Sequence, residues 1–195
     1  TTISYVPSTN PYNIAIKSAC TNPPIANTDL VLTALVEDGA NGTVNILTND
    51  TDLDGNPTSP TNGTGQFVVD LDVLTAGVQT TLTNTNGVYT YNTTSGVITF
   101  DPANNYNGTA TLIYQLCDPT ALCDTARIIF TVSPVNDAPL VIGNNTTTTE
   151  DVPVTLANIL ANDTDADNTL LAANIDLDPN TAGIQSTKTT LQGVW

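Results

Sequence analysis

The feature that most limits the possible folds of this chain is an internal repeat. Residues 37–52 reappear as residues 150–165, at an offset of 113 (150 − 37), and both copies hold ED, then IL, then NDTD. A second block, residues 70–79, reappears as residues 176–185 at an offset of 106 (176 − 70). Such repetition predicts a chain built from copies of one supersecondary unit.

The copies differ in extent. Residues 193–195 align with residues 87–89, where the second copy stops, and Ile3 to Pro7 resembles Ile98 to Pro102. We therefore expect three segments: 1–23 as the tail of a preceding repeat, 24–137 as one complete repeat, and 138–195 as the first half of the next repeat. Neighbouring repeats, or head-to-tail copies of the same protein, are the expected partners.

Strand patterns cover most of the sequence. Two segments, residues 108–116 and 124–133, each bring alternate apolar side chains to one face, with the period of two that is typical of half-buried antiparallel strands. These side chains are Ala110, Leu112, Tyr114, Leu116, Ala126, Ile128, Phe130 and Val132. Further strands are expected at residues 30–36, 43–47, 67–73, 79–82, 88–91 and 97–100. The predicted fold class is all-β, with tandem immunoglobulin/cadherin-like antiparallel β-sandwiches, the second one incomplete.

The charge of the chain excludes two classes of partner. Nineteen acidic residues stand against three basic ones, which gives a net charge of −16. Nucleic acids and anionic membranes are bound through basic patches, so neither is expected. Since the sequence has no apolar run of about 18 residues, no membrane insertion is expected either.

Alternating aspartates form the repeated loop. Asp50, Asp52 and Asp54 in the first copy correspond to Asp163, Asp165 and Asp167 in the second. Three carboxylates so close in sequence repel unless a cation lies between them, and oxygen ligands without Cys or His favour Ca²⁺. An EF-hand is excluded, because its twelfth position falls on Thr61 or Asn174. The alternative is that these side chains only cap backbone N–H groups in turns.

Two of the three cysteines are placed for a disulfide. Cys117 and Cys123 flank a five-residue turn between the two longest expected strands, on the face opposite the core-facing set. A disulfide there indicates an oxidising compartment, and two reduced thiols are the alternative. The partner of Cys20 stays open.

Three sequence elements together resemble a known family. Val135 to Pro139 reads VNDAP, Glu150 to Val154 reads EDVPV, and Leu160 to Asn168 reads LANDTDADN. These elements resemble the cadherin-like, immunoglobulin-fold tandem repeats of large bacterial surface proteins. The hairpin from Tyr114 to Ala126 is most similar to repeats in the adhesins of gliding bacteria. The resemblance implies an extracellular location at the bacterial cell surface, with export by the type IX system.

The resemblance also implies a place for the cation. In a sandwich of this kind the loop with Glu37 and Asp38 lies at one end of a repeat, and the aspartate loop lies at the facing end of the next. The linker residues Asn136 and Asp137 lie between them. We expect these groups to converge with Asp163, Asp165 and Asp167 on Ca²⁺ that stiffens the array. The upstream linker, residues 21–25, lacks the family aspartate, so any site at Asp50, Asp52 and Asp54 is expected to be weaker.

The expected function is a structural and adhesive stalk module. No histidine is present, so Ser-His and Cys-His nucleophile systems are excluded, and neither catalytic residues nor enzymatic activity are expected. A carbohydrate-binding module is the alternative, although aromatic residues make up only 5% of the chain. Surface glycans, a host or a substratum are the further expected partners.

Overall fold

The structure, a computed structural model, describes residues 2–5, 16–19, 21–58, 61–190 and 193–194. The chain divides into two compact units, Thr1–Val135 and Asn136–Trp195, which are called unit 1 and unit 2 below. They differ sharply in regular structure, because every described strand longer than two residues belongs to unit 1.

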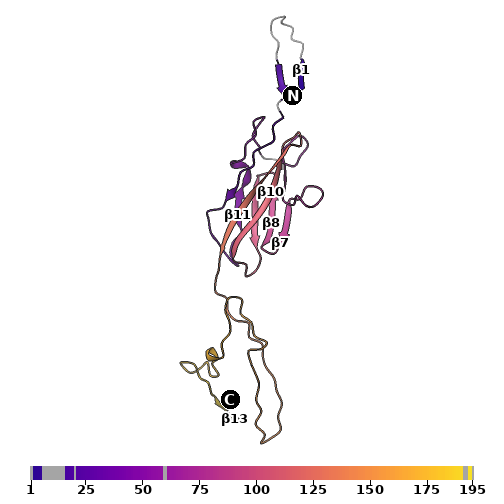
Figure 1. The fold of residues 1–195 in the computed structure, drawn as a ribbon. Coiled ribbons are helices and arrows are strands. Elements are labelled where there is room, and N and C mark those ends of the chain that lie inside the picture. The colour runs from indigo at the N-terminus through magenta and orange to yellow at the C-terminus, as the bar shows by residue number, and fades with distance from the viewer. Residues whose placement is uncertain (1, 6–15, 20, 59–60, 191–192, 195) are drawn as a thin grey trace. The chain divides into compact units, whose positions relative to one another are not determined.

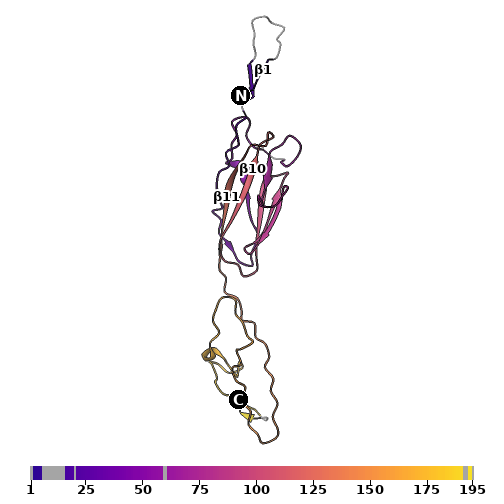
Figure 2. The ribbon, with the colours of Figure 1, turned by 45° about the vertical axis from the view of Figure 1, so that its right-hand side comes forward.

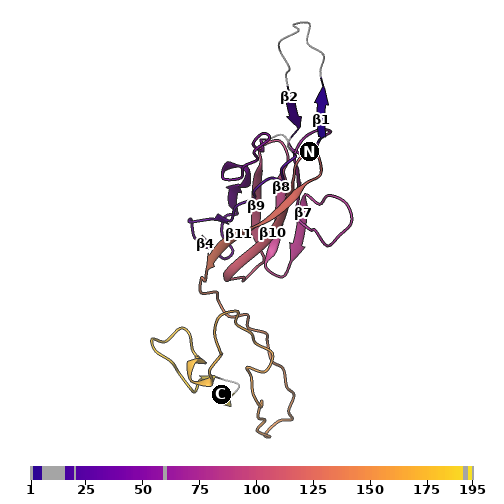
Figure 3. The ribbon, with the colours of Figure 1, turned by 45° about the horizontal axis from the view of Figure 1, so that its top comes forward.

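Unit 1 is a sandwich of two sheets, as the strand patterns predicted (Figures 1 and 2). The first sheet has the order β3 (Asp29–Leu30), β11 (Cys123–Ser133), β10 (Gly108–Cys117) and β6 (Val68–Asp70), and β4 (Leu35–Val36) also pairs with β11. The second sheet has the order β5 (Gly42–Asn45), β9 (Val97–Pro102), β8 (Gly87–Asn92) and β7 (Thr81–Asn84). Figure 3 shows the neighbouring strands β7, β8 and β9 together.

The core lies between these sheets and consists of the predicted alternating side chains. All eight apolar positions predicted for β10 and β11 are buried. Three aromatic rings join the layers: Phe100 lies 4.5 Å from Tyr89 and 4.9 Å from Phe130, between ring centroids. Because each sheet turns one face inward, burial follows every second residue, which confirms the period-two interpretation.

The single strand expected at residues 30–36 is wrong, since the structure has two short strands there. Both pair parallel with β11, with Asp29 opposite Ile128 and Leu35 opposite Val132. From Asp29 to Leu35 the chain advances six residues, while the paired segment of β11 advances only four. Residues 29–35 therefore contain two extra residues and form a bulge, in which Leu32 is 87% exposed.

The strand expected at residues 43–47 ends early for a local reason. Asn45 accepts a hydrogen bond at its side chain from the backbone N–H of Leu47 (3.1 Å), and a 3₁₀ turn, η1 (Ile46–Thr48), follows. A side chain that bonds to the backbone in this way competes with the strand ladder.

The hairpin of β10 and β11 is closed by a disulfide. Cys117 and Cys123 are direct cross-strand neighbours and form an S–S bond, as predicted. Cys20 lies outside the described residues.

The first segment of the chain contains one further strand pair. β1 (Thr2–Tyr5) pairs antiparallel with β2 (Ile16–Ala19). The similarity of Ile3–Pro7 to β9 falls partly on residues 6–15, which lie outside the described part. The expectation that residues 1–23 are the tail of a preceding repeat stays a prediction.

Unit 2 consists mainly of loops. Its elements are η2 (Ala172–Asn174), β12 (Thr189–Thr190) and β13 (Gly193–Val194), and β12 pairs with β13. Over residues 136–190, no residue is as deeply buried as those that form the core of unit 1. Apolar side chains such as Val141 and Leu171 are instead 70% and 57% exposed.

Candidate functional site

In unit 1 the aspartate loop holds the chain segment that leads into the sandwich. The backbone N–H of Asn27 donates to Oδ1 of Asp50, and that of Asn22 donates to Oδ2 of Asp54, both at 2.7 Å. Between them Ile25 exchanges two backbone hydrogen bonds with Thr51. The outer carboxylates of the loop therefore fix the entering segment at two points.

Unit 2 repeats this arrangement with its own residues. Ile142 donates its N–H to Oδ1 of Asp163 (2.7 Å), Asp137 donates to Oδ2 of Asp167 (2.6 Å), and Leu140 pairs with Thr164. The residues of the linker correspond at an offset of 115 (140 − 25), whereas those of the aspartate loop correspond at an offset of 113. The same contacts form in both units despite these different offsets, so the hydrogen bonds between linker and aspartate loop belong to the repeat.

The middle aspartate of each loop shapes the loop itself. Oδ1 of Asp52 accepts from the N–H of Asp54 (2.7 Å), and Oδ1 of Asp165 accepts from the N–H groups of Asp167 (2.9 Å) and Asn168 (2.7 Å). These are Asx turns, so the capping alternative describes what these side chains do within each unit. Asn168 also donates to Oδ1 of Asn136 (2.9 Å).

The structure places Glu37 at the end of β11. Its buried carboxylate accepts from the N–H of Val135 (2.6 Å) and from Nδ2 of Asn107 (3.0 Å). Its neighbour Asp38 has a left-handed backbone (φ 54°) and accepts from the N–H of Asn105 (3.2 Å). Glu37 thus fixes the point where unit 1 leads into the linker, whereas Asp38 holds the loop between β9 and β10.

The chemistry of the donor set in unit 2 fits Ca²⁺. Each of Asp163, Asp165 and Asp167 uses one oxygen for a backbone N–H, and its other oxygen accepts no hydrogen bond from the described residues. Free carboxylate oxygens are the ligands that Ca²⁺ prefers. Within the described part of the chain, however, no three acidic side chains form a metal-binding group. Calcium binding therefore stays a prediction.

Sequence reasoning missed a buried carboxyl pair behind the first loop. The Tyr114 hydroxyl lies 3.0 Å from Oδ2 of Asp50, 3.3 Å from Oδ2 of Asp29 and 3.3 Å from the carbonyl oxygen of Asn27. One hydroxyl proton cannot serve three acceptors at once, so this arrangement favours a protonated form of one of the carboxyl groups. Burial, followed by the charge of Asp50, raises the pKa of Asp29 to about 7. Burial likewise raises the pKa of Asp50 and of Tyr114.

A signal for this cluster was present in the sequence. Tyr114 belongs to the predicted core-facing set, and a buried tyrosine hydroxyl normally finds a polar partner. The repeat also places Asn144, a neutral side chain of similar shape, at the position of Asp29.

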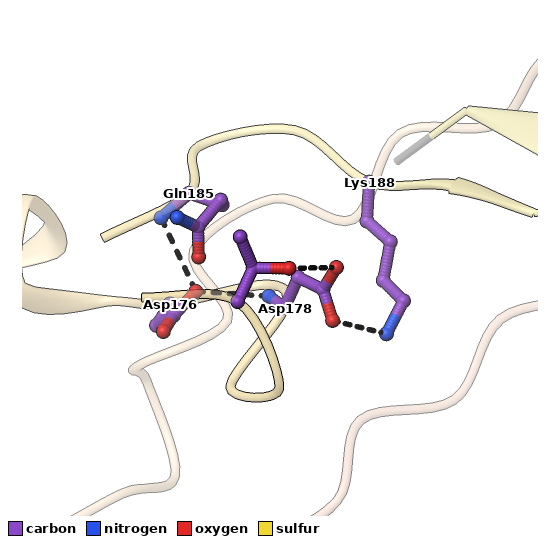
Figure 4. Close-up of polar contacts among 5 residues, drawn as sticks. Asp176, Asp178, Gln185 and Lys188 are labelled. Carbon is purple, nitrogen blue, oxygen red and sulfur yellow. Dashed lines mark hydrogen bonds and ion pairs between the residues drawn. The ribbon is translucent and has the colours of Figure 1, made fainter. Parts of the chain in front are cut away.

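The second repeated block forms a matching turn in both units. Oδ1 of Asp70 accepts from the N–H of Gln79 (3.0 Å), and Oδ1 of Asp176 accepts from the N–H of Gln185 (3.2 Å). In unit 2, Lys188 adds an ion pair with Asp178 at 2.9 Å (Figure 4). Its hydrogen bond lowers the pKa of Asp178, and Thr181 adds to the effect.

Comparisons with known proteins gave a match to a family and matches to solved structures. The extracellular cadherin domains 1–5 of Protocadherin Gamma B2 superpose on 68% of this chain with a TM-score of 0.37 and 19% sequence identity, and this chain spans 24% of that one. Among curated proteins, no sequence matches significantly. No helix in the described ranges is long and apolar enough to cross a membrane. A family described as "Bacterial Ig domain" matches residues 21–131, more than half of the 195 residues, and the chain therefore belongs to the bacterial Ig domain family.

Proposed function

We propose that this chain is a structural and adhesive stalk module of a repetitive extracellular bacterial surface protein or filament, stiffened by Ca²⁺ at the junctions between repeats. Membership of the bacterial Ig family supports an extracellular structural role without catalysis. The Cys117–Cys123 disulfide supports an oxidising location. The likeness of the β10–β11 hairpin to adhesins of gliding bacteria supports a cell-surface protein of that kind.

The observation that carries the proposal is the repeated anchoring of the linker. Glu37 binds the N–H of Val135, the last residue of unit 1, and Asp167 binds the N–H of Asp137, two residues later. Carboxylates thus fix the backbone at Val135, where unit 1 ends, and at Asp137, near the start of unit 2. Ca²⁺ bound to the remaining carboxylate oxygens of Asp163, Asp165 and Asp167 would offset the repulsion that a net charge of −16 produces, and would stiffen the linker.

Calcium is tested by unfolding the full chain in CaCl₂, in MgCl₂ and in EDTA at equal ionic strength. Binding to the folded state alone stabilises it by about 2.7 kcal/mol at a ligand concentration 100 times Kd, so the melting temperature should rise in Ca²⁺. Equal melting temperatures in Ca²⁺ and EDTA would exclude the calcium site.

Two matched variants locate the site. Asn can accept the same backbone hydrogen bond as Asp, so Asp165→Asn preserves the turn while it removes the charge. We expect this variant to lose most of the calcium response. Asp52→Asn, the same change in the first loop, should lose less, because the upstream linker lacks the family aspartate. A calcium response that survives in Asp165→Asn would place the ion elsewhere.

A further inference from the structure

The outward faces of the two sheets of unit 1 carry almost no charge. Residues 73–100 contain no charged side chain, although the whole chain has a net charge of −16. Among the four strands of the second sheet, all of which the structure describes, Asp101 is the one charged residue, and it is exposed. The fully described strands β10 and β11 turn one charged side chain outward, the exposed Arg127, because Asp124 shares the core-facing side with Leu116. Each outward face therefore has one isolated charge, and the two charges are opposite.

The outward face of the first sheet, called the Arg127 face below, consists of Leu30, Ile113, Arg127 and Ile129. Arg127 lies directly opposite Ile113, and Ile129 lies directly opposite Leu30. Leu30 and Ile113 are 59% and 48% exposed, and Ile129 is half-buried. Within the described part of the chain, Arg127 joins no ion pair. The face therefore presents a guanidinium without a carboxylate partner, next to three apolar side chains.

The outward face of the second sheet, called the Asp101 face below, consists of Val88, Thr90, Val97, Thr99 and Asp101. Asp101 lies directly opposite Val88, and Thr99 lies directly opposite Thr90. All five positions alternate with the buried residues of β8 and β9, so their side chains point away from the core. Val88 and Val97 are half-buried, and the carboxylate of Asp101 joins no ion pair among the described residues. This face therefore presents a carboxylate without a cationic partner, next to valine and threonine side chains.

The two faces complement each other. Each places its charged side chain directly beside a β-branched apolar one, Ile113 on the Arg127 face and Val88 on the Asp101 face. Two sheets pack about 10 Å apart with their strands within about 30° of each other, and extended Arg and Asp side chains can meet across such a gap. The planar guanidinium binds a carboxylate through two parallel hydrogen bonds, which fixes the orientation of the partners.

The charge of the chain limits which surfaces of two copies can meet. Two molecules with a net charge of −16 repel each other. Salt screens this repulsion over about 8 Å at physiological ionic strength, so acidic residues inside a contact matter most. A contact between an Arg127 face and an Asp101 face brings together one guanidinium and one carboxylate. A contact between two Asp101 faces would instead bring together two carboxylates, and is disfavoured.

We propose that unit 1 binds a second copy of this chain by packing its Arg127 face on the Asp101 face of that copy, with Arg127 of one molecule paired with Asp101 of the other. Because the two faces differ, each molecule in a pair keeps one free face, and further copies add side by side. This lateral association goes beyond the stalk function and does not depend on calcium.

The size of the faces predicts a weak contact. Four strands at a spacing of about 4.8 Å are about 19 Å wide, and six residues extend about 20 Å, which gives about 400 Å² per molecule. Stable complexes bury about 800 Å² per partner. We therefore expect association at high protein concentration, and one unfavourable charge pair should weaken it strongly.

The test measures self-association of the full chain by sedimentation equilibrium up to about 1 mM, in EDTA and at physiological ionic strength. We expect the average molar mass to rise steadily with concentration, because the contact is open-ended. Arg127→Asp and Asp101→Arg each bring like charges together in the contact, so each variant should associate at least about tenfold more weakly than the wild type. A monomer over the whole range, or unchanged association in either variant, would overturn the proposal.

An equimolar mixture of the two variants tests the pairing itself. In the mixture, the new carboxylate of Arg127→Asp faces the new guanidinium of Asp101→Arg, and the unchanged Arg127 and Asp101 also face each other. Association should therefore return to the wild-type level. The average net charge of the mixture equals that of the wild type, so overall repulsion cannot account for the recovery. A mixture that associates as weakly as the separate variants would overturn the proposal.

A third variant separates the two faces from the overall charge. Asp101→Arg and Glu150→Arg both change the net charge from −16 to −14 (−16 + 2). Glu150 is an exposed residue of unit 2 and belongs to neither face. Lower overall repulsion should leave the association of Glu150→Arg at or above the wild-type level, whereas Asp101→Arg should associate more weakly. The same effect in both variants would overturn the proposal, because association would then depend on net charge alone.

Discussion

Units 1 and 2 share their turns but not their burial. The aspartate loop, the linker bridge and the Asp-Gln turn have the same hydrogen bonds in both units. Among the described residues, those of unit 1 alone place apolar side chains in a closed core. The comparison shows that these turns depend on a few neighbouring residues, whereas burial depends on strands that come much later in the sequence.

Glu37 and its counterpart Glu150 show the same difference in burial at one position of the repeat. Glu37 is 2% exposed because Asn107 and Val135, which follow β9 and β11, cover and bind it. Glu150 is exposed. The backbone turn beside them is nevertheless conserved between the copies, since Asp38 and Asp151 have φ values of 54° and 62°.

The largest effect is expected from truncating the same side chain in each unit. Ile46→Ala empties a fully buried position and should lower the free energy of unfolding of unit 1 by about 3 kcal/mol. Ile159→Ala, at the half-buried counterpart, should cost less than about 1 kcal/mol in unit 2. Denaturant unfolding monitored by hydrogen exchange separates the units. Equal losses for the two variants would contradict the difference in burial.

A smaller effect is expected from pH, and only in unit 1. The pKa of Asp29 is about 7 in the folded protein against an ordinary value of 3.8, so the folded state holds this proton more tightly. The resulting stabilisation is complete below pH 4 and is lost as the pH rises to about 7, by an amount on the order of 4 kcal/mol.

Asp29→Asn, which copies Asn144 of unit 2, is the matched test of this pH dependence. The variant keeps a neutral side chain at all pH values, so its stability relative to the wild type should increase between pH 4 and 7. Measurements in EDTA exclude any contribution from a metal. Parallel pH profiles of the two proteins would show that Asp29 does not carry the shifted proton.

The smallest effect concerns the ion pair between Lys188 and Asp178 in unit 2. Lys188→Gln removes the hydrogen bond that depresses the pKa of Asp178, so this pKa should rise toward its ordinary value. The contact is half-exposed, and no measurable change in stability is expected. NMR titration of the Asp178 carboxyl checks the shift, and Lys188→Arg should preserve the low value. An unchanged titration in Lys188→Gln would mean that Thr181 dominates.

The sequence predicted features that depend on short-range patterns. The core-facing residues of β10 and β11, the disulfide between them and the equivalence of the two aspartate loops all follow from periodicity or repetition. The bulge between β3 and β4 was not predictable, because residues 30–36 are almost uniformly apolar and carry no alternation. The Asp29–Tyr114 contact joins residues 85 positions apart, and no local pattern encodes such a meeting.

The parallel pairing of β3 and β4 with β11 has a mechanical consequence. The chain enters the sandwich through one of these partners and leaves it through the other. A force that pulls the two ends of unit 1 apart drags neighbouring parallel strands in opposite directions along their common axis. Their hydrogen bonds are then loaded in shear, all at once, instead of being unzipped one by one. Resistance to stretching should therefore reside in this strand pair, with the unfolding rate under load as its measure.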